Sequence, residues 1–380
     1  MTAVDRGGPP RPAPARPATV LPRALLLVPG GLALLAGVDA ALLLLGVPAP
    51  VTADRLPQVH GVLLVLGFVG TLIALERAIA LRWTAGYLGP LGLGVGGLLL
   101  LAPVPLAVGI SVQLLGAASL LGVYVALWRR QRDDAVLVQA LGAVLAAGAL
   151  LLWLGEIPFP LLLPWLVGFV VLTIGGERLE LARLSMGPRA GGTLVLLSGG
   201  LIGGTVAALL WPAAGTALLG AALLALVGWL AAHDVARHTI RSTGLPRFMA
   251  ACMLAGYAWL GVAGAIWLVG GPATAGARYD AVVHAVFLGF TLSMIMAHAP
   301  VILPTVLRRP LPYSPALAVP PVLLHASLVL RLWLGDAHGV VGAWRWGGVL
   351  NIAAVLLFVV LAAGSVALAA HRAGTAGGTT

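Results

Sequence analysis

Long apolar runs dominate this sequence and limit what it can fold into. Twelve stretches of roughly 20 apolar residues, the length that crosses a bilayer core of about 30 Å as a helix, follow one another from residue 24 to residue 369. Hydrophobic residues make up 60% of the 380-residue chain and charged residues only 9%. Because a backbone in lipid must satisfy its own hydrogen bonds, the runs are expected to be helices. The sequence therefore predicts an all-α, multi-pass membrane protein.

The spans form one expected domain over residues 24–370. A Pro/Arg-rich tail at 1–23 is expected to be disordered and to lie in the cytoplasm, and a second cytoplasmic tail at 371–380 is expected to be flexible. The third and fourth spans are separated only by the short proline turn "APVPL". The twelve spans are placed near 24–46, 58–82, 86–102, 104–128, 134–154, 159–182, 191–211, 213–232, 248–270, 279–303, 313–334 and 343–369.

The basic residues predict the orientation. All 22 of them are arginines, and a cytoplasmic N-terminus followed by twelve spans leaves all but Arg55, Arg278, Arg331 and Arg345 on the inner side. This pattern follows the positive-inside rule and predicts cytoplasmic termini in an inner (cell) membrane of the bacterial type. Topology thus accounts for the net charge of +10. Membrane lipid is the expected surrounding, and nucleic-acid binding is not expected.

A short repeat recurs every four spans. The segments "GFVGTLIALER" (67–77), "GFVVLTIGGER" (168–178) and "GFTLSMIMAHA" (289–299) each begin with Gly-Phe and carry a polar residue nine positions later. Those polar residues are Glu76, Glu177 and His298. All three segments run from outside to inside in the expected topology. They predict an approximate threefold arrangement of four-helix units.

Two histidines are expected at one depth of the membrane. His60 and His284 each lie near the outer end of an inward-running span. Two neutral imidazoles facing each other across a bundle can hold a b-type haem iron from both sides. Gly61 and Gly67, the latter on nearly the same face as His60, would leave room for the macrocycle. The alternative is that each histidine is an interfacial residue, wetted by headgroups or bonded to a carbonyl.

The other ionisable residues within the spans are expected to form a polar layer near the cytoplasmic side. It comprises Glu76, Arg77, Glu177, Arg178 and His298, and an ion-pair network that locks the helix ends is favoured over a proton path. His298 lies fourteen residues after His284, the spacing of two stacked haems on one helix. The span at 58–82 has Ala74 at the matching depth, however, so one haem is expected rather than two.

His325, near mid-depth, is a further candidate ligand with weaker support. It is the one other histidine that the expected topology embeds in a span.

The segment "HAVFLGFTLSMIMAHAPVILP" (284–304) and the "HG" that opens the second span carry a family resemblance. The whole resembles the catalytic subunit I of haem–copper oxidases, and in size and character it is more similar to the NnrS family of haem- and copper-containing membrane proteins linked to nitric oxide stress. By this resemblance, His60 and His284 match the low-spin haem ligand positions. It implies haem b and a redox partner.

The sequence also departs from the oxidases. The spans at 159–182 and 191–211 contain no histidine, and "FPLLLPWLVGF" (159–169) lacks the His-x-x-x-Tyr of an oxygen-reducing site. Oxygen reduction at a haem–copper centre is therefore not expected. No residue pattern supports copper, although the resemblance leaves it open, and no residue is assigned a catalytic role.

Three functions remain from the sequence. The first is a membrane haem protein that handles nitric oxide, electrons or a related small ligand. The second is a proton- or ion-coupled small-molecule transporter that uses Glu76, Glu177 and His298. The third is a structural subunit of a larger complex. A threefold repeat whose units all have the same orientation favours the membrane haem protein over a transporter, because transporter repeats are commonly inverted.

Overall fold

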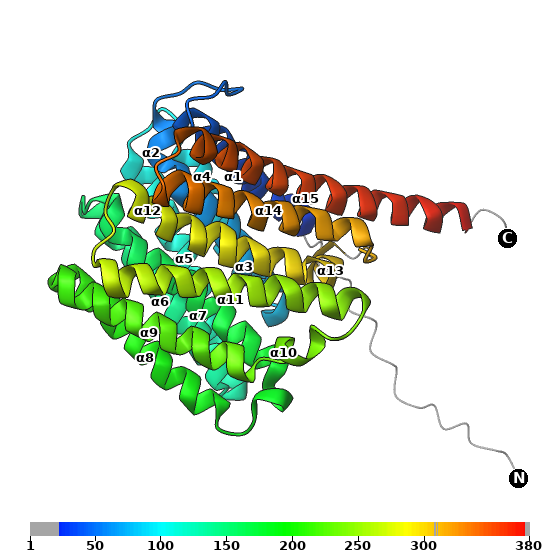
Figure 1. Ribbon diagram of the computed structural model, residues 1–380. Coiled ribbons are helices and arrows are strands. Elements are labelled where there is room, and N and C mark those ends of the chain that lie inside the picture. The colour runs from blue at the N-terminus through cyan, green and yellow to red at the C-terminus, as the bar shows by residue number, and fades with distance from the viewer. Residues whose placement is uncertain (1–22, 308, 310, 377–380) are drawn as a thin grey trace, which may run out of the picture.

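The computed structural model describes residues 23–307, 309 and 311–376, and every regular element in this part of the chain is helical (Figure 1). The predicted tail at 1–23 lies outside the described residues except for Arg23. The longer helices are α1 (Arg23–Leu44), α3 (Thr71–Leu81), α4 (Leu88–Leu99), α5 (Leu106–Gln131), α6 (Asp134–Leu154), α7 (Phe159–Met186), α8 (Ala190–Leu210), α9 (Pro212–His233), α11 (Gly244–Gly270), α13 (Ser293–Leu307) and α15 (Val341–Ala376). The shorter ones are α2 (Arg55–Val62), α10 (Ala236–Thr239), α12 (Gly276–His284) and α14 (Val319–Leu328), with 3₁₀ turns η2 (Thr84–Tyr87) and η4 (Pro315–Ala318).

Three long helices each contain a π-helical segment. These segments are η1 (Leu63–Gly70), η3 (Ala285–Leu292) and η5 (Val329–Ala337). The first joins α2 to α3, the second joins α12 to α13, and the third extends α14. A π segment interrupts the i→i−4 hydrogen-bond ladder and is often found at functional sites.

Eleven helices in the described part of the chain are long and apolar enough to cross a membrane. The predicted span at 86–102 is not confirmed as a twelfth helix of that length. Its regular helix, α4, has 12 residues, which corresponds to about 18 Å. The segment is rich in glycine and is followed by two prolines, both of which shorten a helix.

The glycines of α4 allow it to pack tightly against α5. A Cβ atom at Gly92 would lie 2.8 Å from the Cα atom of Gly116, and one at Gly116 would lie 2.5 Å from the backbone nitrogen of Leu93. Such distances exclude any larger side chain at either position without movement of the helices. Small residues at this contact let the two backbones approach closely, as the "GLGVGG" string predicts.

The α4–α5 turn lies beside the start of α2. The guanidinium of Arg55 donates hydrogen bonds to the carbonyl oxygens of Ala102 and Val104, the second at 2.7 Å. At the other end of these helices, Arg130 of α5 donates to the carbonyl of Leu81 at 3.3 Å. The chain therefore travels from one end of the bundle to the other between Leu81 and Ala102.

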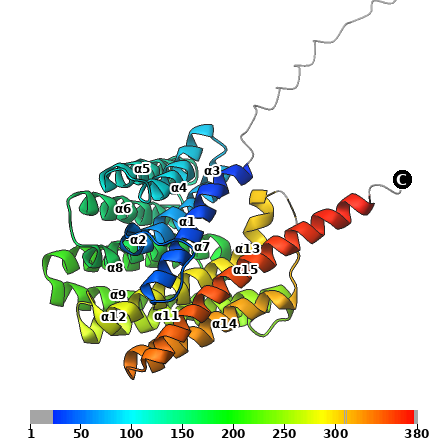
Figure 2. The same ribbon diagram turned by 90° about the horizontal axis from the view of Figure 1, so that it is seen from above.

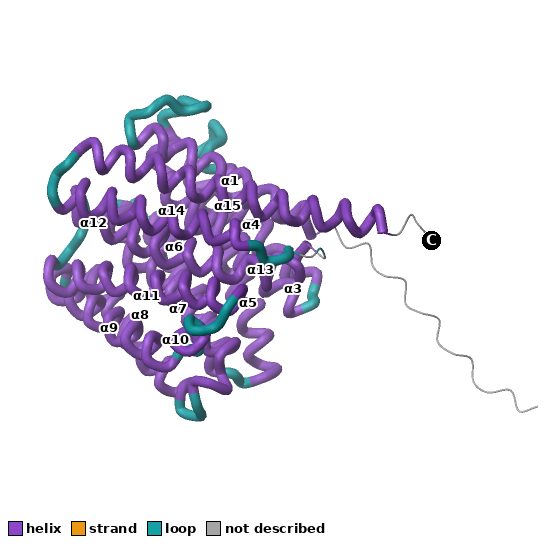
Figure 3. The backbone as a smooth tube through the Cα atoms, turned by 45° about the vertical axis from the view of Figure 1, so that its right-hand side comes forward, coloured by secondary structure: helices purple, strands orange, loops and turns teal. Residues whose placement is uncertain are grey.

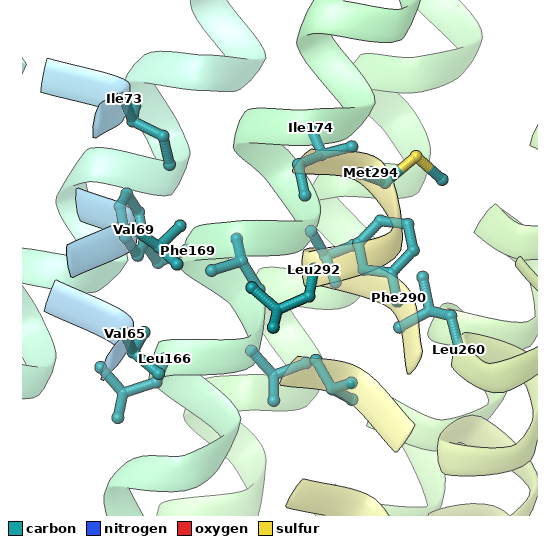
Figure 4. Close-up of a cluster of buried hydrophobic side chains, with 14 of the residues drawn as sticks. Val65, Val69, Ile73, Leu166, Phe169, Ile174, Leu260, Phe290, Leu292 and Met294 are labelled. Carbon is teal, nitrogen blue, oxygen red and sulfur yellow. The ribbon is translucent and has the colours of Figure 1, made fainter. Parts of the chain in front are cut away.

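The three repeat segments meet in the middle of the bundle. Figure 4 shows side chains of η1, α7 and η3, among them Val69, Phe169 and Leu292, gathered in one buried apolar cluster. Phe169 and Phe290, from the Gly-Phe pairs of two repeats, are fully buried. Close van der Waals packing of this kind is a main source of helix association inside a membrane.

Helix α15 runs past the edge of the bundle. Its last turns project away from the other helices in Figures 1, 2 and 3. The helix continues to Ala376, so part of the predicted flexible tail at 371–380 is helical, and residues 377–380 lie outside the described part.

Candidate functional site

His60 and His284 line the same cavity. It lies between α1, the α2–η1 segment, the α12–η3 segment, η5 and α15, and its volume inside an open mouth is about 90 Å³. Most of its lining side chains are aliphatic or phenylalanine. Its polar wall residues are His60, His284, Thr291, Arg331 and Asn351. An apolar cavity with a few polar groups is the usual form of a cofactor or small-molecule site.

Each imidazole has one nitrogen held by the backbone. Nδ1 of His60 donates to the carbonyl oxygen of Gly37 at 2.8 Å, and Nδ1 of His284 donates to the carbonyl oxygen of Asp280 at 2.8 Å. A carbonyl only accepts, so each Nδ1 carries the proton and each Nε2 keeps its lone pair in the neutral ring. A second-shell hydrogen bond of this kind is typical of histidines that ligate a metal.

Three side chains, those of Asp280, Arg331 and Trp344, form a hydrogen-bonded group beside His284. The Oδ1 atom of Asp280 lies 3.3 Å from His284 Nδ1, and Arg331 donates two hydrogen bonds to the same carboxylate at 2.9 and 2.7 Å. Trp344 donates to Asp280 Oδ2 at 3.3 Å, and the Arg331 guanidinium lies 5.2 Å from the centre of its ring. A bidentate arginine fixes both the position and the charge of the carboxylate.

Gly67 does not line this cavity. A Cβ atom there would lie 3.0 Å from the Cβ atom of Ala33 and 3.7 Å from the Cα atom of Gly97, so Gly67 faces the contact of η1 with α1 and α4. The glycines in the cavity wall are Gly61, directly after His60, and Gly348 of α15. The π-helical segment changes the angle per residue, which is why a helical count of seven residues from His60 misplaces Gly67.

The predicted polar layer is present at the other end of the bundle. Arg77 of α3 pairs with Glu76 at 3.0 Å and with two residues of α7, Glu180 at 2.9 Å and Glu177 at 3.6 Å. Gln139 of α6 also donates to Glu180, at 3.2 Å. Arg77 therefore pairs both across helices and with its neighbour in sequence.

Arg178 forms the second half of this layer. It donates two hydrogen bonds to Asp234 at 2.8 and 3.1 Å and one to Nε2 of His298 at 2.9 Å. Nδ1 of His298 donates to the carbonyl of Met294 at 2.8 Å, so both ring nitrogens are bonded. Tyr257 completes the group by donating to Asp234 at 2.7 Å. Arg178 thus joins α7 to α13 in a buried network.

His325 is separate from the cavity and fully bonded. Trp259 donates to its Nδ1 at 3.0 Å, and its Nε2 lies 3.1 Å from Ser293 Oγ, which in turn donates to the carbonyl of Cys252. The ring therefore links α14 to α11 and α13 and has no nitrogen left for a metal.

Three residues of these sites were missed by the sequence analysis. Asp280 precedes His284 by four residues and so lies on the same helix face, a signal that could have been used. Arg331 was expected on the outer side, and Asp234 follows the expected span at 213–232, yet Asp234 is completely buried. His233 is the last residue of α9 and is exposed, and its neighbour Asp234 turns inward to Arg178.

Within the described part of the chain, no three His, Cys, Asp or Glu side chains are arranged to hold one metal ion. The structure therefore adds nothing in favour of copper. Comparison with curated proteins and with solved structures finds no match. A family model does match, over residues 23–367, which is the whole of the helical bundle. The chain belongs to the family described as Domain of unknown function (DUF8744).

Proposed function

We propose that this protein is an integral membrane protein that holds one b-type haem between His60 and His284, for passing electrons or handling nitric oxide or a related small ligand. The observation that carries the proposal is the shared cavity, in which two histidines from different helices both keep Nε2 unbonded while Nδ1 is fixed. Nitric oxide is suggested only by the resemblance to the NnrS family.

The residues present fit a haem in two respects. The walls are mostly apolar, and the donors are two neutral imidazoles. Arg331 adds a cation to the wall, where it can pair with an acidic substituent of a bound group. When bound, such a haem supplies a one-electron carrier whose potential is set by its axial ligands and their hydrogen bonds. The chain's contribution is to fix both rings and to exclude water.

The absorption spectrum of the purified protein tests this proposal. Protein made in cells supplied with haem should show a Soret band and, when reduced, the sharp α-band of a six-coordinate low-spin haem. Wild-type protein without Soret absorption would refute the proposal.

The proposal includes a threefold architecture in which the three repeat units have the same orientation in the membrane. The segments η1 and η3 both place their Gly-Phe pair at the fifth and sixth positions, and the matching stretch of α7 begins at Pro164. A proline removes a backbone hydrogen bond, so all three repeats loosen the helix at the same point. The contacts Arg77–Glu177 and Arg178–His298 connect the three repeat helices in turn.

A twelve-crossing topology with cytoplasmic termini is also proposed. The travel of the chain from one end of the bundle to the other between Leu81 and Ala102 supports a crossing by α4 despite its length, and without that crossing the orientation of the later helices would be reversed. Reporter fusions after Arg132 and after Arg247 are expected to be cytoplasmic, and one after Gly276 periplasmic. A periplasmic reporter after Arg132 would contradict the crossing by α4, because only that crossing returns the end of α5 to the inner side.

Asp280 is expected to tune the proposed haem through His284. The Asp280→Asn variant keeps the backbone carbonyl that accepts from Nδ1 and removes the negative charge 3.3 Å from that ring. We expect the haem midpoint potential to rise and haem affinity to fall by about 10- to 100-fold, as for other lost second-shell partners. Redox titration and haem transfer to apomyoglobin measure the two effects. Asp54→Asn, an exposed carboxylate before α2, is the matched control.

A further inference from the structure

The inner polar layer contains more acids than its basic residue can neutralise. Three carboxylates, Glu76, Glu177 and Glu180, surround the single guanidinium of Arg77. Their side chains are 29%, 19% and 40% exposed, respectively, so the group lies partly buried at the end of the bundle and is in contact with water. Fully ionised, these four residues would carry two negative charges in excess.

Glu177 is the carboxylate with the poorest partners. Glu76 and Glu180 each accept a hydrogen bond from Arg77, and Glu180 accepts another from Gln139. Glu177 Oε1 lies 3.6 Å from Arg77 Nη2, beyond hydrogen-bond distance, and this oxygen is buried with no donor. A buried charge without a hydrogen bond is costly, and a carboxylate in this position reduces the cost by taking up a proton.

Two fully buried polar side chains in the same group each have an oxygen atom without a hydrogen-bond partner. Gln139 is completely buried and donates through Nε2 to Glu180, and its Oε1 accepts no hydrogen bond. Gly176, next to Glu177, leaves room for the Gln139 side chain, because a Cβ atom at Gly176 would lie 2.5 Å from Gln139 Cγ. Tyr124 of α5, also completely buried, has an unbonded hydroxyl near Arg77 and the glutamates. The group thus offers one unused acceptor and one unused hydroxyl.

The neighbouring charged groups do not neutralise the excess. Arg178 points away to Asp234 and His298, where its donors are used. Arg183, one turn further along α7, pairs with Asp133 at the start of α6. Arg178 therefore acts on Glu177 only by its charge, and the other groups nearby are the two fellow carboxylates, Arg77, Tyr124 and, through Glu180, Gln139.

We infer that this group is a proton-binding site in which Glu177 takes up and releases one proton from the water at the inner end of the bundle. The change is the addition of a proton to a carboxylate oxygen of Glu177, which makes it a carboxylic acid and lowers the excess charge by one. Gln139 Oε1 is the unused acceptor in the group for the new O–H. Neighbouring carboxylates favour the protonated form, and Arg77 opposes it. The inference does not depend on haem.

Infrared titration of the full-length protein in detergent tests the inference. A protonated carboxyl group gives a C=O stretching band that disappears on ionisation, so the wild-type protein should lose such a band between mildly acidic and mildly alkaline pH. Glu177→Gln, which keeps the shape of the side chain, should remove this transition. Glu156→Gln, an exposed carboxylate in the loop before α7, is the matched control and should retain it.

Two further variants distinguish Glu177 from its neighbours. Glu76→Gln removes a negative charge beside Glu177 and should move the transition to lower pH, because the ionised form becomes easier to make. Arg77→Met should move it to higher pH. If the band persists in Glu177→Gln, or if no transition occurs in the wild-type protein, the inference is wrong. Haem content, measured on the same samples, tests the proposed function separately.

Discussion

Replacing either cavity histidine by alanine is expected to remove the low-spin haem spectrum. His60→Ala and His284→Ala each delete one of the two cavity-lining imidazoles whose Nε2 atom has no hydrogen bond. Loss of one axial ligand should leave a high-spin haem or none, so the reduced α-band should disappear. Optical spectra and the haem-to-protein ratio of the purified variants measure this result.

Two variants control for general disruption of the bundle. His338→Ala removes an exposed histidine just after η5, and Glu76→Gln changes the inner polar layer at the other end of the same long helix as His60. Both should keep the wild-type spectrum. If His60→Ala and His284→Ala also keep a six-coordinate low-spin haem, the cavity is not the haem site.

Loss of Asp234 is expected to give the largest fall in stability. Asp234→Ala would leave the guanidinium of Arg178, only 4% exposed, without its carboxylate, and Tyr257 without its acceptor. Removing one partner of a buried ion pair costs about 3–5 kcal/mol, because the other charge stays buried. Unfolding in mixed micelles should show a decrease of this size in the free energy of unfolding.

The exposed pair Arg183–Asp133 supplies the comparison. The Arg183 side chain is 55% exposed, so Arg183→Ala should cost no more than about 1 kcal/mol. In the double variant Arg178→Met, Asp234→Ala the unpaired charge is gone, and stability should partly recover. An Asp234→Ala variant as stable as Arg183→Ala would show that the network does not hold the helix ends together.

The helical body was largely predictable from the sequence. Eight of the predicted spans correspond closely to single long helices whose bounds lie within a few residues of those expected. The spans at 58–82, 279–303 and 313–334 each correspond to several helical segments, one of them a π segment, joined end to end. The membrane-length requirement acts on each segment by itself, so a local count of apolar residues is sufficient. The length of α4 was missed, because its end depends on close packing of glycines against α5.

The members of the polar layer were also predictable. Charged residues are rare in apolar spans, and their spacing along the helices places Glu76, Arg77, Glu177, Arg178 and His298 near one end. The ionic partners of such residues could not be predicted. In the polar layer, Asp234 lies 56 residues from Arg178, and beside the cavity, Arg331 lies 51 residues from Asp280, so neither pairing leaves a signal in local sequence.

By itself, the sequence determined which segments are helices, which residues lie at each depth and that His60 and His284 share one level of the bundle. These properties follow from hydrophobicity and from a rise of about 1.5 Å per residue along each helix. The tertiary structure decided which side chains face one another. That depends on the rotation of each helix about its axis, which the π segments alter and which only packing against neighbours fixes. It is why, of the two expected glycines, Gly61 lines the cavity and Gly67 does not, and why Asp280, Arg331 and Trp344 surround His284.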